Sequence, residues 1–115
     1  MIPSVETMIE QYVDTWNASS LEAYKAGFAA CWAPEATYTD PGHALIQGVD
    51  GIADLALHSW NQLPGRKFNI LKRPVFHHNS GKYYWTVALP EGPRQGLDYF
   101  EFNDQFQITR LVSFF

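Results

Sequence analysis

Apolar residues recur every three or four positions over the first sixteen residues of the chain. The stripe consists of Val5, Met8, Ile9, Tyr12, Val13 and Trp16. This spacing predicts a helix over residues 5–16 with one buried face. Ser4 is placed to cap its N-terminus, because a serine hydroxyl can accept a hydrogen bond from the first helical turn.

A second apolar stripe follows after a short polar break. It consists of Leu21, Tyr24, Phe28, Cys31 and Trp32. Ser19 and Glu22 have the spacing of a capping box, which predicts the start of a second helix. We expect Pro34 to end this helix, because its ring clashes with a further helical turn.

The segment Tyr38-Thr39-Asp40-Pro41-Gly42 separates the second helix from a third. Residues 36–40 favour a short strand that ends at Asp40, and Pro41-Gly42 then turns the chain. A third stripe consists of Ile52, Leu55, Ala56, Ser59, Trp60 and Leu63. We expect Asp50 to cap this third helix and Pro64-Gly65 to end it.

The pattern changes to strands after Lys67. Residues 68–76 form one extended segment, a turn follows at residues 79–81, and residues 82–89 alternate between apolar and polar positions. Further strands are predicted over residues 95–102 and 106–115. Helices followed by an antiparallel meander predict a single α+β domain over residues 1–115, in which three helices pack on a curved, mainly antiparallel sheet.

The strand over residues 95–102 directs one acidic side chain into the interior in either register. Asp98 shares a face with Phe100 and Phe102, whereas Glu101 lies on the opposite face. Burying a carboxylate costs several kcal/mol unless it is paired or neutral. A pocket beside this strand explains a buried Asp98, and the alternative is that the Asp98 face points outward.

Composition and charge exclude several classes of function. The chain is 46% apolar and 16% aromatic, which suits either a packed core or an aromatic-lined cavity. The net charge of −4 argues against nucleic-acid binding, which needs a cationic surface. We expect the basic cluster of Arg66-Lys67 and Lys72-Arg73 to be a solvated face. The chain contains neither a membrane-spanning apolar run nor a signal-peptide pattern, so we expect a cytoplasmic protein that does not bind membranes.

Metal-ligating residues are sparse. Cys31 is the only cysteine, which excludes an intramolecular disulfide and predicts a small buried apolar residue. His77 and His78 are adjacent on a strand, so their side chains point to opposite faces and cannot share a metal ion. His43 and His58 do not belong to the H-E-x-x-H motif that binds metal ions on a helix. We therefore expect no metal and no cofactor.

The order of motifs resembles the SnoaL-like polyketide cyclases of the nuclear transport factor 2-like superfamily, which also contains the ketosteroid isomerases. The matching segments are Trp16-Asn17, Pro34-Glu35-Ala36-Thr37-Tyr38-Thr39-Asp40-Pro41, Gly48 and Ile108-Thr109-Arg110-Leu111-Val112-Ser113-Phe114-Phe115. The resemblance implies a cone-shaped fold with an apolar pocket, a homodimer formed through the sheet, and a cofactor-independent isomerase or cyclase.

The same resemblance implies roles for three residues. Asp40 matches the general base of ketosteroid isomerase, Asp98 its protonated oxyanion-hole acid, and Tyr12 its oxyanion-hole tyrosine. Removing a proton next to a carbonyl requires a base and donors that hold the enolate oxygen. Asp40 can instead be an ordinary turn residue and Tyr12 a core residue, while His43 is a candidate second acid or base.

Other residues can line a cavity or fill a packed core. They are Trp32, His43, His58, Trp60, Trp85, Phe100 and Phe115. By resemblance, His58 can also belong to an Asp–His pair. Two further functions remain open. One is non-catalytic binding of a small apolar molecule in the same pocket, and the other is an association module whose dimer interface contains either Tyr83 and Trp85 or Tyr84 and Thr86.

Overall fold

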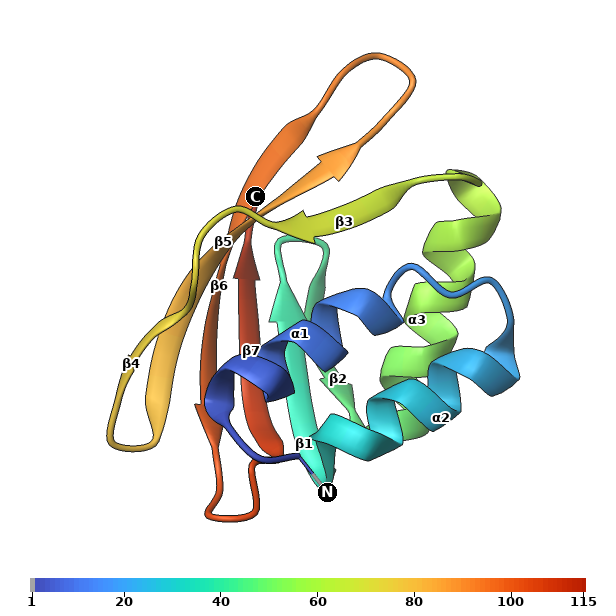
Figure 1. The fold of residues 1–115 in the computed structure, drawn as a ribbon. Coiled ribbons are helices and arrows are strands. Elements are labelled where there is room, and N and C mark those ends of the chain that lie inside the picture. The colour runs from blue at the N-terminus through green and yellow to red at the C-terminus, as the bar shows by residue number, and fades with distance from the viewer. Residues whose placement is uncertain (1) are drawn as a thin grey trace.

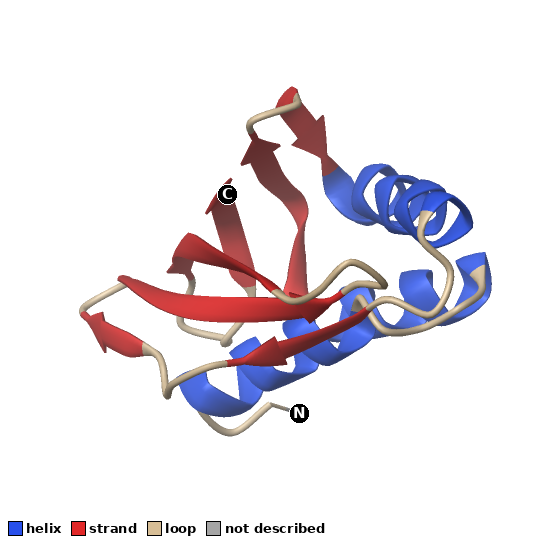
Figure 2. Cartoon of the chain, turned by 90° about the horizontal axis from the view of Figure 1, so that it is seen from above, coloured by secondary structure: helices blue, strands red, loops and turns tan. Residues whose placement is uncertain are grey.

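Three helices lie on one side of a curved seven-stranded sheet (Figures 1 and 2). The structure is a computed structural model that describes residues 2–115. Its elements are α1 (Val5–Thr15), α2 (Leu21–Cys31), β1 (Trp32–Asp40), β2 (His43–Gln47), α3 (Gly48–Gln62), β3 (Lys67–Ile70), β4 (Val75–His77), β5 (Ser80–Ala88), β6 (Arg94–Phe102) and β7 (Ile108–Phe114). None of the helices in this part of the chain is long and apolar enough to cross a membrane.

The sheet is mixed but mostly antiparallel. Its strand order is β2-β1-β7-β6-β5-β3, and β4 pairs with β5 beside this path. The β1–β7 pair is parallel, whereas the other pairs are antiparallel. The predicted α+β architecture, with helices on a curved and mainly antiparallel sheet, is therefore confirmed.

The helix N-termini agree only partly with the predicted caps. The Ser4 hydroxyl accepts a hydrogen bond from the Thr7 backbone amide, as predicted. The cap of α2 is Ser20 rather than Ser19, because Ser20 has the extended backbone that precedes the first turn. Helix α3 has no side-chain cap. Asp50 lies inside its first turn, where a carboxylate stabilises the helix by interacting with its dipole.

The junction between α2 and β1 differs from the prediction. Trp32 was expected in the helix but is the first residue of β1, so the chain passes directly from helix to strand. Pro34 consequently lies in the strand instead of after the helix. The β1–β7 register shifts between Trp32 and Thr37, and a proline without an N–H group is tolerated where the ladder is irregular.

Two strand boundaries were also predicted wrongly. Residues 43–47 form β2, which pairs with β1 through a tight turn that brings Asp40 opposite His43. The extended segment predicted over residues 68–76 is two strands, β3 and β4, separated around Pro74. The turn before β5 contains His78, with a φ of 53°, so Ser80 already belongs to the strand.

The structure answers the question of which acid of β6 faces inward. Asp98 and Phe100 are buried, whereas Tyr99 and Glu101 are partly exposed. Tyr83 of β5 lies directly opposite Asp98 in the ladder, and both side chains enter the interior. The sheet therefore carries a carboxylate on the face that the helices cover.

Candidate functional site

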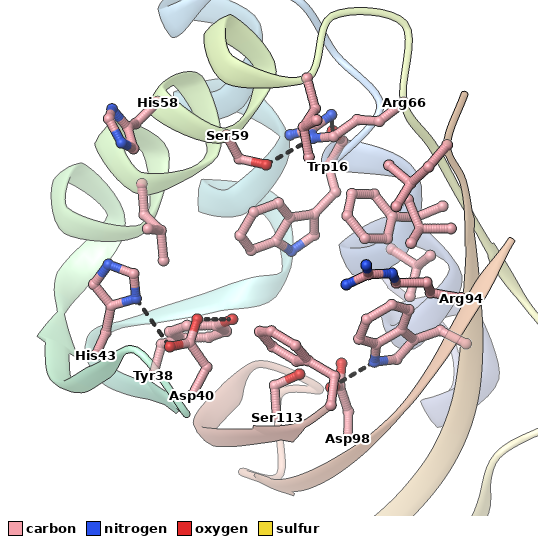
Figure 3. A pocket seen from close by; sticks show the side chains of 18 of the residues that line it. Trp16, Tyr38, Asp40, His43, His58, Ser59, Arg66, Arg94, Asp98 and Ser113 are labelled. Carbon is pink, nitrogen blue, oxygen red and sulfur yellow. Dashed lines mark hydrogen bonds and ion pairs between the residues drawn. The ribbon is translucent and has the colours of Figure 1, made fainter. Parts of the chain in front are cut away.

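The helices and the covered face of the sheet enclose a cavity of about 350 Å³ (Figure 3). This volume lies at the lower end of the range for small-molecule sites. Much of the wall is apolar, with side chains such as Leu55, Phe68 and Val87. The titratable and hydroxyl-bearing side chains on the wall are Tyr12, Tyr38, Asp40, His43, His58, Ser59, Arg66, Arg94, Asp98 and Ser113.

Asp98 is a nearly completely buried carboxylate on the cavity wall, with 4% of its surface exposed. Tyr83 donates a hydrogen bond of 2.5 Å to its Oδ2 atom, and Trp85 Nε1 donates one of 2.8 Å to Oδ1. Both donors come from β5. Ser113 of β7 lies opposite Asp98 in the ladder and its hydroxyl is a further donor. Side chains of both neighbouring strands thus hold this carboxylate.

Two opposing effects determine the pKa of Asp98. Burial raises it from 3.8 to about 6, although hydrogen bonds from Ser113, Tyr83 and Trp85 favour the ionised form and oppose the rise. At pH 7 a group with this pKa is about nine-tenths ionised. Asp98 can therefore accept a proton near neutral pH, and its role as a protonated oxyanion-hole acid, which the resemblance implies, stays a prediction.

Tyr12 enters the same cavity from α1. Its ring is buried and stacks on Trp32, with ring centroids 5.6 Å apart. Burial and the nearby charge of Asp98 raise its pKa well above 10, so the hydroxyl keeps its proton. Tyr83, rather than Tyr12, is the tyrosine that hydrogen-bonds Asp98. Among residues 2–115 the Tyr12 hydroxyl finds no hydrogen-bond acceptor, so its proton is available to a ligand.

Asp40 combines the two roles considered from the sequence, a turn residue and a cavity residue. Its side chain is 6% exposed and lies on the cavity wall. The Gly42 backbone amide and His43 Nδ1 each lie 2.9 Å from Oδ1, and the Tyr38 hydroxyl donates to Oδ2 over 2.9 Å. A carboxylate has about four acceptor positions, so one position remains for a ligand. His43 is the first residue of β2 and is partly exposed.

Three hydroxyl groups around these carboxylates were not predicted from the sequence. Tyr38 lies two residues before Asp40 on β1, and the alternation of a strand places both side chains on one face. Tyr83 was considered only as a candidate for a dimer interface, and its pairing with Asp98 depends on the β5–β6 register. Ser113 was recognised only as part of the C-terminal motif. Period-two alternation can identify Tyr38, whereas Tyr83 and Ser113 require the register.

Two arginines on the cavity wall were also missed. Arg66 was expected on a solvated face but is 3% exposed, so that prediction is wrong for this residue. Its guanidinium donates to the Ser59 hydroxyl and to the backbone carbonyls of Trp16 and Ala56, which lie 2.7, 2.8 and 3.1 Å away. Arg94 begins β6, and Figure 3 shows its guanidinium directed into the cavity.

The predicted lining residues are only partly brought together. Four of them line the cavity, namely His43, His58, Trp85 and Phe115. The other three do not belong to its wall. Trp32 and Phe100 are buried in the core, and Trp60 packs against the Arg66 guanidinium, which lies 5.6 Å from the centre of its ring.

Comparisons with known proteins identify the domain type. Residues 9–111 match the SnoaL-like domain. A structure from Agrobacterium tumefaciens strain C58, named as an isomerase of the SnoaL-like family, is 26% identical, with a TM-score of 0.84 over 94% of this chain and 93% of that one. None of the curated proteins matches the chain.

Two other solved structures share the fold at lower identity. A protein named as a ketosteroid isomerase from Kribbella flavida is 20% identical, with a TM-score of 0.73 over 96% of this chain and 76% of that one. A protein named as a polyketide cyclase from Sinorhizobium meliloti is 20% identical, with a TM-score of 0.73 over 92% of each chain. Further similar structures are named for the cystatin-like and nuclear transport factor 2-like folds, which is the fold of this chain.

Proposed function

Because the chain belongs to the SnoaL-like family, we propose that it is a cofactor-independent enzyme of the isomerase or cyclase type. It moves a proton at the carbon next to the carbonyl group of a small, largely apolar compound. The observation that carries this proposal is the buried carboxylate of Asp98 on the wall of a largely apolar cavity that also receives the Tyr12 hydroxyl. The names of the similar structures, isomerase and polyketide cyclase, support the same class of reaction.

In this proposal Asp98 is the general base. A base works best when its pKa lies near the working pH, and burial brings the pKa of Asp98 to about 6. The hydrogen bonds from Tyr83 and Trp85 fix the orientation of the carboxylate. The substrate carbon that loses the proton lies against the remaining acceptor position of Asp98.

Tyr12 then stabilises the enolate oxygen. Its hydroxyl is a donor that exists before the reaction and needs no rearrangement, which makes it effective on a largely apolar cavity wall. The raised pKa of Tyr12 ensures that the proton is shared with the oxygen and stays on the tyrosine. Asp40 and His43 form a second acid–base pair, which returns a proton to the product.

The test is hydrogen–deuterium exchange at the carbon next to the carbonyl, followed by NMR in D₂O. The probes are 4-phenyl-2-butanone, which is uncharged, and 4-oxo-4-phenylbutanoate, which carries a carboxylate. We expect exchange to fall at least about a hundredfold in Asp98→Asn and about tenfold in Tyr12→Phe and in Asp40→Asn. Glu101→Gln is the control, because Glu101 lies on β6 outside the cavity.

Three outcomes of this experiment would change the proposal. Exchange at the uncatalysed rate for both probes in the wild type would contradict catalysis and favour a binding protein. Normal exchange in Asp98→Asn would remove Asp98 as the base. If Asp40→Asn is the more damaged variant, the roles of the two carboxylates are those that the resemblance implies.

A second candidate role concerns the outer face of the sheet. Tyr84 and Phe114 are 46% and 54% exposed there, so an apolar surface is available for association. We propose that this face forms a homodimer, with Tyr84 rather than Tyr83 or Trp85 in the interface. Light scattering should then give twice the chain mass for the wild type and the chain mass for Tyr84→Glu. The cytoplasmic location stays a prediction.

A further inference from the structure

Arg94 is a solvent-exposed cationic side chain at the start of β6, on the inner face of the sheet. Along β6 the inward positions are Arg94, Gly96 and Asp98, because alternate residues share a face. Figure 3 shows the guanidinium directed into the cavity, and Arg94 belongs to its wall. Within residues 2–115 this guanidinium makes neither a hydrogen bond nor an ion pair. An arginine without a partner on a cavity wall is free to bind an anion.

Trp85 separates Arg94 from the carboxylate of Asp98. Its indole ring lies over Gly96, so closely that a Cβ atom at this position would overlap the ring. Trp85 also donates its N–H group to Asp98. Four residues of strand span about 13 Å, so the wall between Arg94 and Asp98 consists of one aromatic surface. The inner face of β6 therefore offers a cation, an apolar surface and a carboxylate in that order.

Arg66 adds a second uncompensated positive charge to the cavity. A buried cation is normally paired with a carboxylate. Arg66 is instead held by uncharged groups, the Ser59 hydroxyl and two backbone carbonyls, and by the ring of Phe68 at 5.1 Å. No carboxylate among residues 2–115 lies within ion-pair distance of it. In Figure 3 both arginines lie away from Asp40 and His43.

We propose that the substrate is an organic acid, an apolar carbonyl compound that carries a carboxylate. The carboxylate binds the Arg94 guanidinium, the apolar body lies on Trp85, and the reactive carbonyl group reaches Tyr12 and Asp98. The assignment of the reactive end rests on the proposed function. Because both arginines lie away from Asp40 and His43, such a substrate binds in one orientation. The positive charge of Arg66 offsets the repulsion that a chain of net charge −4 exerts on an anion.

The test compares two ligands of the same shape and different charge. The probes are 2-naphthylacetate and its uncharged amide, 2-naphthylacetamide, titrated into the full chain by calorimetry at low ionic strength. We expect the wild type to bind the acid about three- to tenfold more tightly than the amide. In Arg94→Gln this preference is lost, while the dissociation constant of the amide is unchanged. Arg73→Gln removes the same charge from an arginine that is 86% exposed and keeps the preference.

Equal affinity of the wild type for the two probes would overturn the proposal. An equal loss of affinity in Arg94→Gln and Arg73→Gln would also overturn it, because the effect would then come from net charge alone. Absence of binding by either probe at millimolar concentration would exclude this class of ligand. Failure of the proposed function gives a different result, which is selective acid binding without exchange on either ketone probe. If only the organic-acid proposal is wrong, the protein catalyses exchange on the uncharged ketone but binds 2-naphthylacetate no more tightly than its amide.

Discussion

Asp40 and Asp98 are two carboxylates on one cavity wall, and they differ in where their hydrogen-bond donors come from. Each accepts hydrogen bonds from three groups, but the partners of Asp40 lie within three residues of it along the chain. The partners of Asp98 come from β5 and β7, thirteen or more residues away. The surroundings of Asp40 are therefore a property of one hairpin, and those of Asp98 are a property of the assembled sheet. Asp98 is thus held only when β6 is paired with both of its neighbouring strands, whereas Asp40 is held by its own turn.

Truncation of each carboxylate should show the largest difference between them. At pH 5, Asp98→Ala leaves three donors in the interior without their common acceptor, and we expect a loss of about 3 to 4 kcal/mol in the free energy of unfolding. Asp40→Ala removes hydrogen bonds whose partners Gly42 and His43 are exposed and can turn to water, so it should cost only about 1 kcal/mol. Urea denaturation measures both values. Equal losses would mean that the two sites depend on the fold to the same extent.

The pH dependence of stability should reveal the burial of Asp98. Its pKa is 3.8 in the unfolded chain and about 6 in the folded one, so the folded state holds the proton more tightly. The resulting stability is fully present below about pH 4 and is lost as the pH rises through 6. Two pKa units correspond to about 3 kcal/mol.

A neutral variant isolates this contribution. We expect the free energy of unfolding of the wild type, relative to Asp98→Asn, to fall by about 3 kcal/mol between pH 4 and pH 7.5. The titration of all other groups cancels in this difference. A difference that stays constant over the same range would show that burial does not raise the pKa of Asp98.

The smallest expected effect distinguishes Tyr83, which hydrogen-bonds Asp98, from Tyr38, which hydrogen-bonds Asp40. With Asp98 as base, the exchange rate should rise with pH and level off above about 6. Tyr83→Phe removes a donor that favours the ionised carboxylate of Asp98. The pH at which the exchange rate levels off should therefore rise by about one unit. The Tyr38 hydroxyl donates to Asp40, so Tyr38→Phe should leave the pH dependence of the exchange rate unchanged. A rate that falls above pH 6 would mean that Asp98 acts in its protonated form.

Local patterns predicted the elements that have one clearly apolar face. The sequence pattern is strong where one face is buried, as in the apolar stripes of α1 and α3 and the alternation of β5 and β6. In β6, an acidic side chain faces the interior in either register. Strand β2 was missed because four of its five residues are exposed. Without a buried face it has no period-two signal, and its pairing depends on the turn after Asp40.

The cavity charges were harder to predict than the fold. Arg66 looks like part of a basic surface in the sequence, and its burial depends on carbonyl groups of residues ten and fifty positions away. The contact between Asp98 and Tyr83 depends on the β5–β6 register, which the turn between the two strands determines. Sequence patterns describe which face a residue occupies, whereas the partner across that face follows from the assembled sheet.

The parallel pairing of β1 with β7 has a consequence for the order of folding. In the strand order, this pair alone joins the side of the sheet that carries Asp40 to the side that carries Asp98. Tyr38 pairs with Leu111, a separation of 73 residues along the chain, and contacts between distant residues form late because the loop-closure entropy opposes them. Each carboxylate can therefore acquire its nearest partners in its own part of the sheet before the two parts meet. We expect pulse-labelled hydrogen exchange to protect the β5–β6 amides before those that join β1 to β7, so that the cavity closes in the last step of folding.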